Sequence, residues 1–132
     1  MTRKWNIPLT YQPKIGPVTS GECNQTIRPG RKFAVGDLIR FYTWKGRPYW
    51  SKRETITEYM PIIIAGNIII QEWGLENPYN PLEHFPWEEL DDLAAHDGIV
   101  PPTGEALRDV LISKNGKIPA SGVEAQIVRW KP

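Results

Sequence analysis

Most apolar positions along the chain fall in short runs or alternate with polar residues, a pattern typical of β-strands. Residues 38–44, LIRFYTW, are rich in aromatic and β-branched side chains and predict a strand. Lys45-Gly46 predicts a tight hairpin turn, because glycine readily adopts the positive φ that such turns require. We expect the return strand to begin near Tyr49 and to run toward Tyr59.

Further strands are predicted in the middle and at the end of the chain. Residues 62–65 and 68–71 form apolar runs on either side of Gly66-Asn67 and predict a second hairpin. Because these runs are apolar on both faces, we expect their strands to be buried on both sides. Apolar residues alternate with polar ones over 123–127, which predicts a closing strand.

The segment between these strands predicts helices. Residues 80–83 carry the signs of a helix start. A longer helix is predicted over residues 87–96, and Gly98, just after it, is a natural helix stop. A second helix is expected over residues 104–113, with Thr103 as its cap. The apolar side chains expected on the inner side of the longer helix are Trp87, Leu90, Leu93 and Ala94.

Strands followed by helices and one last strand predict the α+β class. We expect a sheet that curls into a β-barrel, with two helices inserted before the last strand. The length of 132 residues fits a single domain over residues 1–132. The hydrophobic content of 40% and the charged content of 23% lie in the globular range, so the chain is expected to fold on its own.

The net charge of +1 conceals a strong segregation of charge along the chain. Residues 28–53 carry eight Lys and Arg against one acid, whereas residues 71–109 carry ten acids against one base. Such an asymmetry predicts a dipolar molecule with one cationic face. Two interpretations stay open: a face that binds an anionic partner, or two solvated surfaces that partly neutralise each other.

The basic segment holds the candidate nucleic-acid-binding residues. Basic side chains suit phosphates, and aromatic side chains among them suit stacking on unpaired bases, which points to single-stranded RNA or RNA loops. The alternative is that the aromatic rings pack in the core or in a hairpin cluster. The candidates are Arg28, Arg31, Lys32, Arg40, Trp44, Arg47, Tyr49, Trp50, Lys52 and Arg53.

The stretch ECNQTIRPGRKFAVGD, residues 22–37, is unusually polar for a segment that leads into a hydrophobic strand. Ile27 is the one strongly apolar residue between Glu22 and Lys32. Polar side chains this dense beside a strand indicate the lining of a cleft.

Three motifs, taken in order, resemble the ASCH domain family, which has the PUA-like β-barrel fold of RNA-associated proteins. They are GECNQTIR at residues 21–28, VGD at residues 35–37 with the aromatic-rich YTWKGRPYWSK at 42–52, and LAAHDGI at 93–99. The closing AQIVRW is similar to the last strand of the family. The resemblance covers about residues 15–131 and implies a PUA-like barrel and association with RNA or a modified nucleoside.

The resemblance also implies catalytic candidates. One branch of the family is an amidohydrolase that removes the acetyl group from N4-acetylcytidine with a Lys, a Thr and an acid. By position, Thr26 matches the Thr, Asp97 matches the acid, and Cys23 stands where the Lys is expected. The cleft would then form where the Thr26 segment faces the end of the first long helix, and Lys14 or Lys32 would have to replace the missing amine.

Ordinary structural roles stay open for the same residues. Thr26 also fits an ordinary strand position, because β-branched side chains suit a pleated surface. Cys23 fits a half-buried structural thiol, since no histidine lies within local reach to lower its pKa.

Other site types find little support in the sequence. His84 and His96 are too few for a metal site, and no phosphate-binding loop is present, so we expect no metal and no cofactor. The longest apolar run is too short to cross a bilayer, and no signal-peptide pattern opens the chain, so we expect a cytoplasmic protein without membrane contact.

Three functions follow as hypotheses. The first is binding of RNA or a modified nucleoside through a cationic cleft. The second is amide hydrolysis of an acylated nucleoside such as N4-acetylcytidine. The third is a phage-like accessory or protein-interaction domain that uses the acidic helix face.

Overall fold

The computed structural model describes residues 2–47, 50–80 and 82–132. The predicted α+β class is confirmed, and two helices stand before the last strand as expected. The helices are α1 (Gln12–Ser20), the 3-10 helix η1 (Trp87–Glu89), α2 (Asp91–His96) and α3 (Gly104–Asn115). The strands are β1 (Lys4–Pro8), β2 (Gln25–Pro29), β3 (Leu38–Trp44), β4 (Arg53–Thr55), β5 (Met60–Ile70), β6 (Gly74–Glu76), β7 (His84–Pro86) and β8 (Val123–Trp130).

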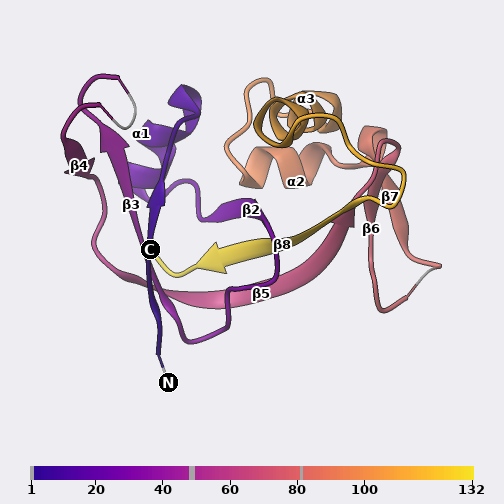
Figure 1. Cartoon of the computed structure of the whole chain (residues 1–132), viewed down its shortest axis with the longest axis horizontal. Coiled ribbons are helices and arrows are strands. Elements are labelled where there is room, and N and C mark those ends of the chain that lie inside the picture. The colour runs from indigo at the N-terminus through magenta and orange to yellow at the C-terminus, as the bar shows by residue number, and fades with distance from the viewer. Residues whose placement is uncertain (1, 48–49, 81) are drawn as a thin grey trace.

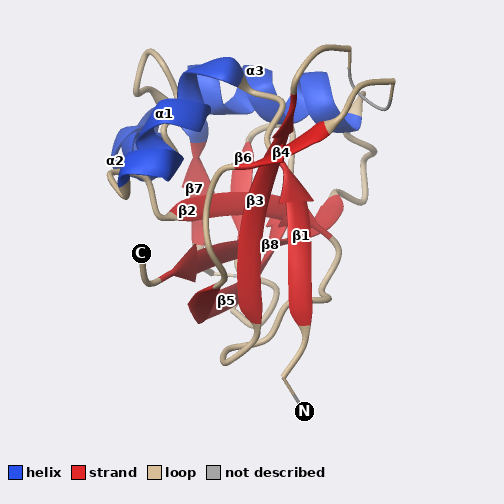
Figure 2. Cartoon of the chain, turned by 90° about the vertical axis from the view of Figure 1, so that its left-hand side faces the viewer, coloured by secondary structure: helices blue, strands red, loops and turns tan. Residues whose placement is uncertain are grey.

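Strand β5 joins the two parts of a mixed sheet. Its first residues pair with β3 and the rest of it pairs with β8, with an irregularity between Ile62 and Ile64. β3 also pairs with β1 in parallel and with β4 in antiparallel orientation, while β8 also pairs with β2 in antiparallel orientation. Figure 1 shows β5 sweeping beneath the molecule from the β1–β3 side to the β6–β7 hairpin. The three α-helices lie along the opposite side (Figures 1 and 2).

The predicted curling of the sheet into a β-barrel is wrong. β1 and β7 end the main row of paired strands, and no ladder joins them within the described part of the chain. β6 and β7 have three residues each and turn away as a hairpin, so they are too short to reach round to β1. A barrel needs tilted strands paired without a break, and this sheet stays open.

Both predicted hairpins also differ from the structure. Residues 62–71 do not form a hairpin, because Gly66 lies opposite Ile127 in the β5–β8 ladder, and backbone pairing with β8 keeps Gly66-Asn67 extended. The return strand after β3 is short and begins at Arg53, which pairs with Trp44. Tyr49, the expected start of that strand, lies outside the described residues.

The helices were predicted with mixed success. Thr103 does cap α3, since its Oγ1 accepts a hydrogen bond from the Ala106 amide at 3.2 Å. The expected helix over 87–96 divides instead into η1 and α2 at Leu90, whose φ of −107° lies outside the helical range. The expected helix start at 80–83 is not seen in its described residues, where the Glu83 amide closes a turn on Asn80. Helix α1 was not predicted at all.

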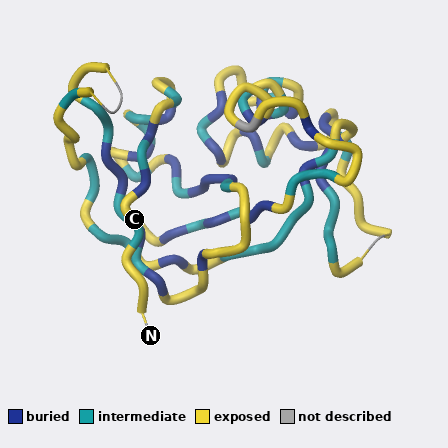
Figure 3. The backbone as a smooth tube through the Cα atoms, in the orientation of Figure 1, coloured by how far each residue is buried: buried dark blue, intermediate teal, exposed yellow. Residues whose placement is uncertain are grey.

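Strand β8 separates two hydrophobic cores. On one side, α1, β1 and β3 enclose a core in which the rings of Phe41 and Trp130 lie 4.7 Å apart. On the other side, α2 and α3 cover Ala125 of β8 and Ile70 of β5. Figure 3 shows buried backbone along β8 and on the inner sides of the helices. Among the described residues, no helix is long and apolar enough to span a bilayer.

Candidate functional site

A buried ion pair lies where α1 approaches the end of α2. Lys14 of α1 places its Nζ 3.2 Å from Oδ1 of Asp97, which follows α2, and the two side chains are 3% and 7% exposed. Lys14 points inward because it shares a helix face with the buried Val18, four residues later. One of the two lysines expected to supply an amine therefore reaches the segment that holds Asp97.

Asp97 is held by more than this one contact. Burial raises the pKa of its carboxyl, while the Lys14 charge and the Gln25 side chain oppose that rise. Oδ1 of Asp97 is therefore partnered by the Lys14 ammonium group at 3.2 Å, and the Gln25 side chain is a second polar neighbour of the carboxyl.

Cys23 closes the inner side of this cluster. Its Sγ donates weakly to the His96 carbonyl at 3.4 Å and lies 3.6 Å from the Gln25 carbonyl. Burial raises the pKa of the Cys23 thiol, so it is protonated at neutral pH and suits packing better than nucleophilic attack. Gly98 beside it has φ +71°, and a Cβ there would come within 3.3 Å of Sγ, so both space and backbone conformation favour glycine.

Two further cations surround Asp97. Arg28 of β2 donates from Nη2 to the Pro8 carbonyl at 3.1 Å, and its buried Nε has no partner among the described residues. Burial lowers the pKa of Arg28 to about 10, partly offset by the Asp97 carboxylate. Lys114 of α3 has its pKa lowered to about 8 by partial burial and by the charges of Arg28 and Lys14. Three cations thus share one acid, which favours an anion in this place.

Thr26 lies on β2 and is 2% exposed. It stands opposite Val128 in the β2–β8 ladder, and Arg28, two residues later, shares its face of the strand. We call Lys14, Cys23, Arg28, Asp97 and Lys114 the junction cluster. The cluster brings together Cys23 and Asp97 of the catalytic hypothesis.

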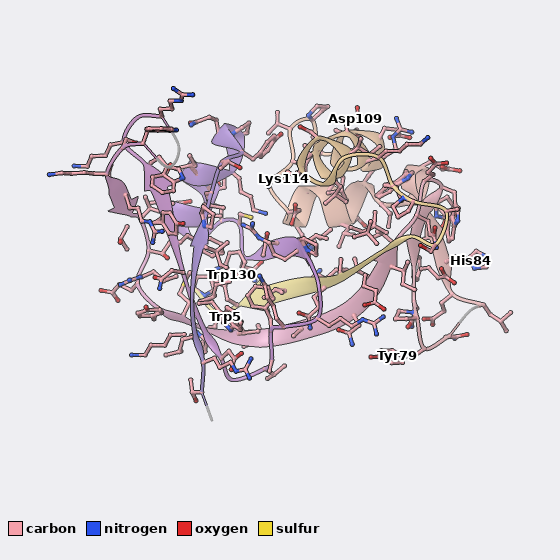
Figure 4. All side chains as sticks on the ribbon, viewed as in Figure 1. Trp5, Tyr79, His84, Asp109, Lys114 and Trp130 are labelled. Atoms are coloured by element: carbon pink, nitrogen blue, oxygen red, sulfur yellow. The ribbon has the colours of Figure 1, made fainter. Side chains whose placement is uncertain are left out.

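A cavity of about 320 Å³ adjoins the cluster at Lys114. It lies between Tyr11, which precedes α1, and Asp109 and Ser113 of α3. The Tyr11 hydroxyl donates to the Val100 carbonyl at 3.3 Å and accepts from the Val100 amide at 3.1 Å. Figure 4 shows Lys114 on the side of α3 that faces α1. Solvent therefore reaches the cluster through Lys114, while Lys14 and Asp97 stay behind it.

The basic candidates of β3 and β4 form a separate surface. The Arg53 guanidinium lies 4.5 Å from the ring centre of Tyr42 and 5.4 Å from that of Trp44. Arg40, also on β3, lies 4.4 Å from the ring of Tyr59 and donates to Asn6 at 2.9 Å. Arg40, Tyr42 and Trp44 alternate along β3 and so share the face opposite Phe41, where Tyr42 is buried and Arg40 and Trp44 are half-buried.

The loop that links β3 to β4 adds to this surface. Trp50 is 79% exposed, and the Arg47 guanidinium lies 5.4 Å from its ring centre. Lys52 is exposed nearby in the sequence. We call Arg40, Tyr42, Trp44, Arg47, Trp50, Lys52, Arg53 and Tyr59 the β3–β4 face.

The remaining basic candidates lie elsewhere. Arg28 belongs to the junction cluster. Arg31 approaches Glu124 at 3.7 Å, and Lys32 lies over the rings of Trp5 and Phe33. The nine described nucleic-acid candidates therefore do not form one continuous patch, because β2 and its following loop belong to a different part of the sheet from β3 and β4.

Sequence reasoning missed Lys114 and Gln25. Lys114 stands in the last turn of α3, where a lysine has an ordinary reason to be, since it suits the negative end of the helix dipole. Gln25 looks like a polar strand residue, yet it is fully buried and donates to the Leu93 carbonyl at 3.4 Å. Neither residue carried a signal of its role in the sequence.

Comparison with known proteins gives no relative. No family model, no characterised protein and no solved structure matches this chain.

Proposed function

We propose that this protein is an ASCH-like RNA-binding module and that the β3–β4 face contacts single-stranded RNA. The observation that carries the proposal is the stacking of Arg40 and Arg53 on aromatic rings beside the open indole of Trp50. The ASCH resemblance of the sequence motifs supports it. The open sheet is a departure from the barrel that the resemblance implies.

The aromatic rings have two roles in this proposal. The rings of Tyr42 and Tyr59 hold the two guanidiniums in place, so less side-chain entropy is lost when these bind phosphate. Among the described residues, no carboxylate lies in ion-pair range of Arg40 or Arg53, so their charges are available. Trp50 differs from these rings because it is largely exposed to solvent, with Arg47 over its ring, which suits stacking on an unpaired base.

The test is binding of a fluorescein-labelled 12-nucleotide oligouridylate, measured by anisotropy over a range of salt concentrations. The proposal expects affinity to fall with salt, because each phosphate contact releases counterions. The double variant Arg40→Gln/Arg53→Gln should lower the slope of log K against log salt by about 1.4, at about 0.7 for each contact with a single strand. The matched control is Arg108→Gln/Lys117→Gln, which removes the half-buried Arg108 and the exposed Lys117, two cations outside the β3–β4 face.

Trp50→Ala isolates the stacking contribution. It should weaken binding by about 1 to 3 kcal/mol without changing the salt slope, since no charge is removed. The proposal fails if the wild type shows no binding at low salt, or if the control pair lowers the slope as much as Arg40→Gln/Arg53→Gln.

A second candidate function is amide hydrolysis of an acylated nucleoside. It is favoured by the amine of Lys14, which lies beside Asp97 and compensates for Cys23 at the family's Lys position. In this candidate the Thr26 hydroxyl adds to the acyl carbon and its proton passes to the departing amine. Lys14 stabilises the oxyanion, and water then hydrolyses the acyl-threonine ester.

Turnover of N4-acetylcytidine, followed by chromatography, tests this candidate. Thr26→Val keeps the shape of the side chain but removes the hydroxyl, so it should abolish turnover in a folded protein. Cys23→Ser is the matched control and should retain activity, because the protonated thiol has no part in the chemistry. Intact substrate after long incubation with concentrated wild-type protein would rule out the hydrolase.

A further inference from the structure

A second hollow lies on the other side of the molecule from α1, between β5, α2 and the β6–β7 hairpin. Its volume is about 740 Å³, within the range of small-molecule sites. Its walls are mainly apolar and are built by Ile64, Ile68, Leu75, Phe85, Leu93 and Ile127. We call this hollow the β5–α2 groove.

Large apolar side chains of this groove are open to solvent. Ile64 and Phe85 are 44% and 43% exposed, on opposite walls. Contiguous exposed apolar surface of this kind marks binding sites in monomeric proteins more often than single exposed residues do. Asn67 and Tyr79 hydrogen-bond to each other at the rim and so hold the β6–β7 hairpin against β5.

Arg129 of β8 supplies a positive charge at one end of the groove. Its Nε donates to Gln25 at 2.9 Å, which fixes the guanidinium plane. In the described part of the chain, no carboxylate lies within ion-pair distance of it. The remaining guanidinium nitrogens of Arg129 are therefore free to donate to a carboxylate or sulfonate in the paired geometry that Arg favours.

The acid in the lining lies at the other end. Arg129 stands opposite Ile64 on β5, whereas Glu76 stands opposite Ile69. Five residues of strand separate these positions, or about 16 Å at about 3.3 Å per residue. Glu76 also accepts a hydrogen bond from Gln71 at 3.1 Å. The charges thus orient an anionic ligand, with its acidic group toward Arg129.

We propose that the β5–α2 groove binds a small organic anion with an apolar body, whose acidic group pairs with Arg129. This site shares no residue with the β3–β4 face or the junction cluster. The apolar walls and the Arg129 guanidinium determine which class of ligand fits. This ligand class is independent of the RNA binding proposed above.

Gly66 offers a direct way to block the groove. It lines the groove on β5, opposite Ile127, and a Cβ built there meets no atom within 4 Å. A branched side chain at this strand position would extend into the open space without a clash and also suits β-structure. Gly66→Ile should therefore fold and fill the groove. Gly16→Ala is the matched control, because a Cβ at Gly16 also meets open space, on the exposed side of α1.

The experiment compares an anionic and a neutral fluorescent probe of similar shape. The probes are 8-anilinonaphthalene-1-sulfonate and N-phenyl-1-naphthylamine, titrated against the folded full chain, with decanoate as a competitor. We expect both probes to bind saturably at one site and decanoate to displace the sulfonate probe. Arg129→Gln should weaken the sulfonate about tenfold or more, since a hydrogen bond to a charged group is lost, and leave the neutral probe within about twofold.

Gly66→Ile should weaken both probes at least about tenfold, and Gly16→Ala should leave both unchanged. If Gly66→Ile does not fold by circular dichroism, Gly66→Ala serves in its place with a smaller expected loss. The proposal is overturned if neither probe binds saturably, if filling Gly66 leaves binding unchanged, or if Arg129→Gln weakens both probes equally.

Discussion

Replacement of Asp97 by Asn gives the most direct test of how the junction cluster is built. Among the described residues, Asp97 is the one carboxylate that interacts with Lys14, Arg28 and Lys114, and its Oδ1 lies 3.2 Å from Lys14 Nζ. At an effective dielectric constant of about 20, two unit charges at this distance attract by about 5 kcal/mol. Asp97→Asn removes that attraction and leaves Lys14 buried beside two like charges.

The expected loss of stability is about 3 to 5 kcal/mol, the usual cost of breaking a buried ion pair from one side. For a chain of 132 residues, an unfolding entropy of about 2.1 cal/mol/K per residue converts this loss to a fall in Tm of about 11 to 18 °C. Urea titration at pH 7, followed by circular dichroism, measures the free energy of unfolding, and calorimetry measures the Tm.

Lys14→Met should cost less than Asp97→Asn, because Arg28 and Lys114 still compensate the Asp97 charge. The double variant Lys14→Met/Asp97→Asn should cost about 2 kcal/mol less than the sum of the single variants, since it removes both charges together. A cost below about 1 kcal/mol for Asp97→Asn, or strict additivity in the double variant, would show that the ion pair does not hold α1 against the end of α2.

Two further predictions concern the two ends of α3. Lys114→Met should raise the free energy of unfolding at pH 7. The pKa of Lys114 is lowered from the ordinary 10.5 to about 8, which means that the folded state disfavours the charged amine. That penalty is full below pH 8 and disappears as the pH rises to 10.5, so the difference between variant and wild type should shrink over this window. Because solvent screens the amine, the difference in unfolding free energy between variant and wild type should be about 1 kcal/mol at most. A difference that grows with pH would contradict this assignment. Gly104→Ala should destabilise by at least about 2 kcal/mol, because its Cβ would come within 1.6 Å of the Trp87 carbonyl oxygen, and unchanged urea midpoints would refute that close approach.

Local patterns were sufficient where an element is specified by its own residues. The strand over 38–44 appears with the predicted bounds, because its aromatic and β-branched side chains favour extended backbone. The cap at Thr103 was predictable for a similar reason, since capping is a contact between residues three apart.

The same patterns misled where distant pairing decided the outcome. Gly66-Asn67 has the composition of a hairpin turn, but β8 pairs with these two residues and with the β5 residues before and after them, which keeps the strand extended. Helix α1 was missed because Pro13, Gly16 and Pro17 look like helix breakers. Pro13 sits in the first turn, where no amide is required, and the buried Lys14 and Val18 secure the helix from the core side.

The sequence named Cys23 and Asp97 of the junction cluster, because short motifs mark their positions in the chain. A catalytic role for Thr26, Asp97 and Cys23 stays a prediction. The partner of Asp97 could not be chosen from the sequence, because Lys14 and Lys32 are equally plausible amines until α1 is placed. Lys14 enters the cluster, whereas Lys32 lies over the rings of Trp5 and Phe33.

The sequence by itself determined the α+β class, the strong separation of basic and acidic segments, and the strands and caps that depend on neighbouring residues. The tertiary structure alone decided that the sheet stays open, that the described basic candidates lie in separate places, and that Arg129 stands beside an apolar groove with no described carboxylate in ion-pair range. The physical reason is one of range. Propensity and capping act between residues a few positions apart, whereas strand pairing and charge burial join segments that the order of the chain does not relate.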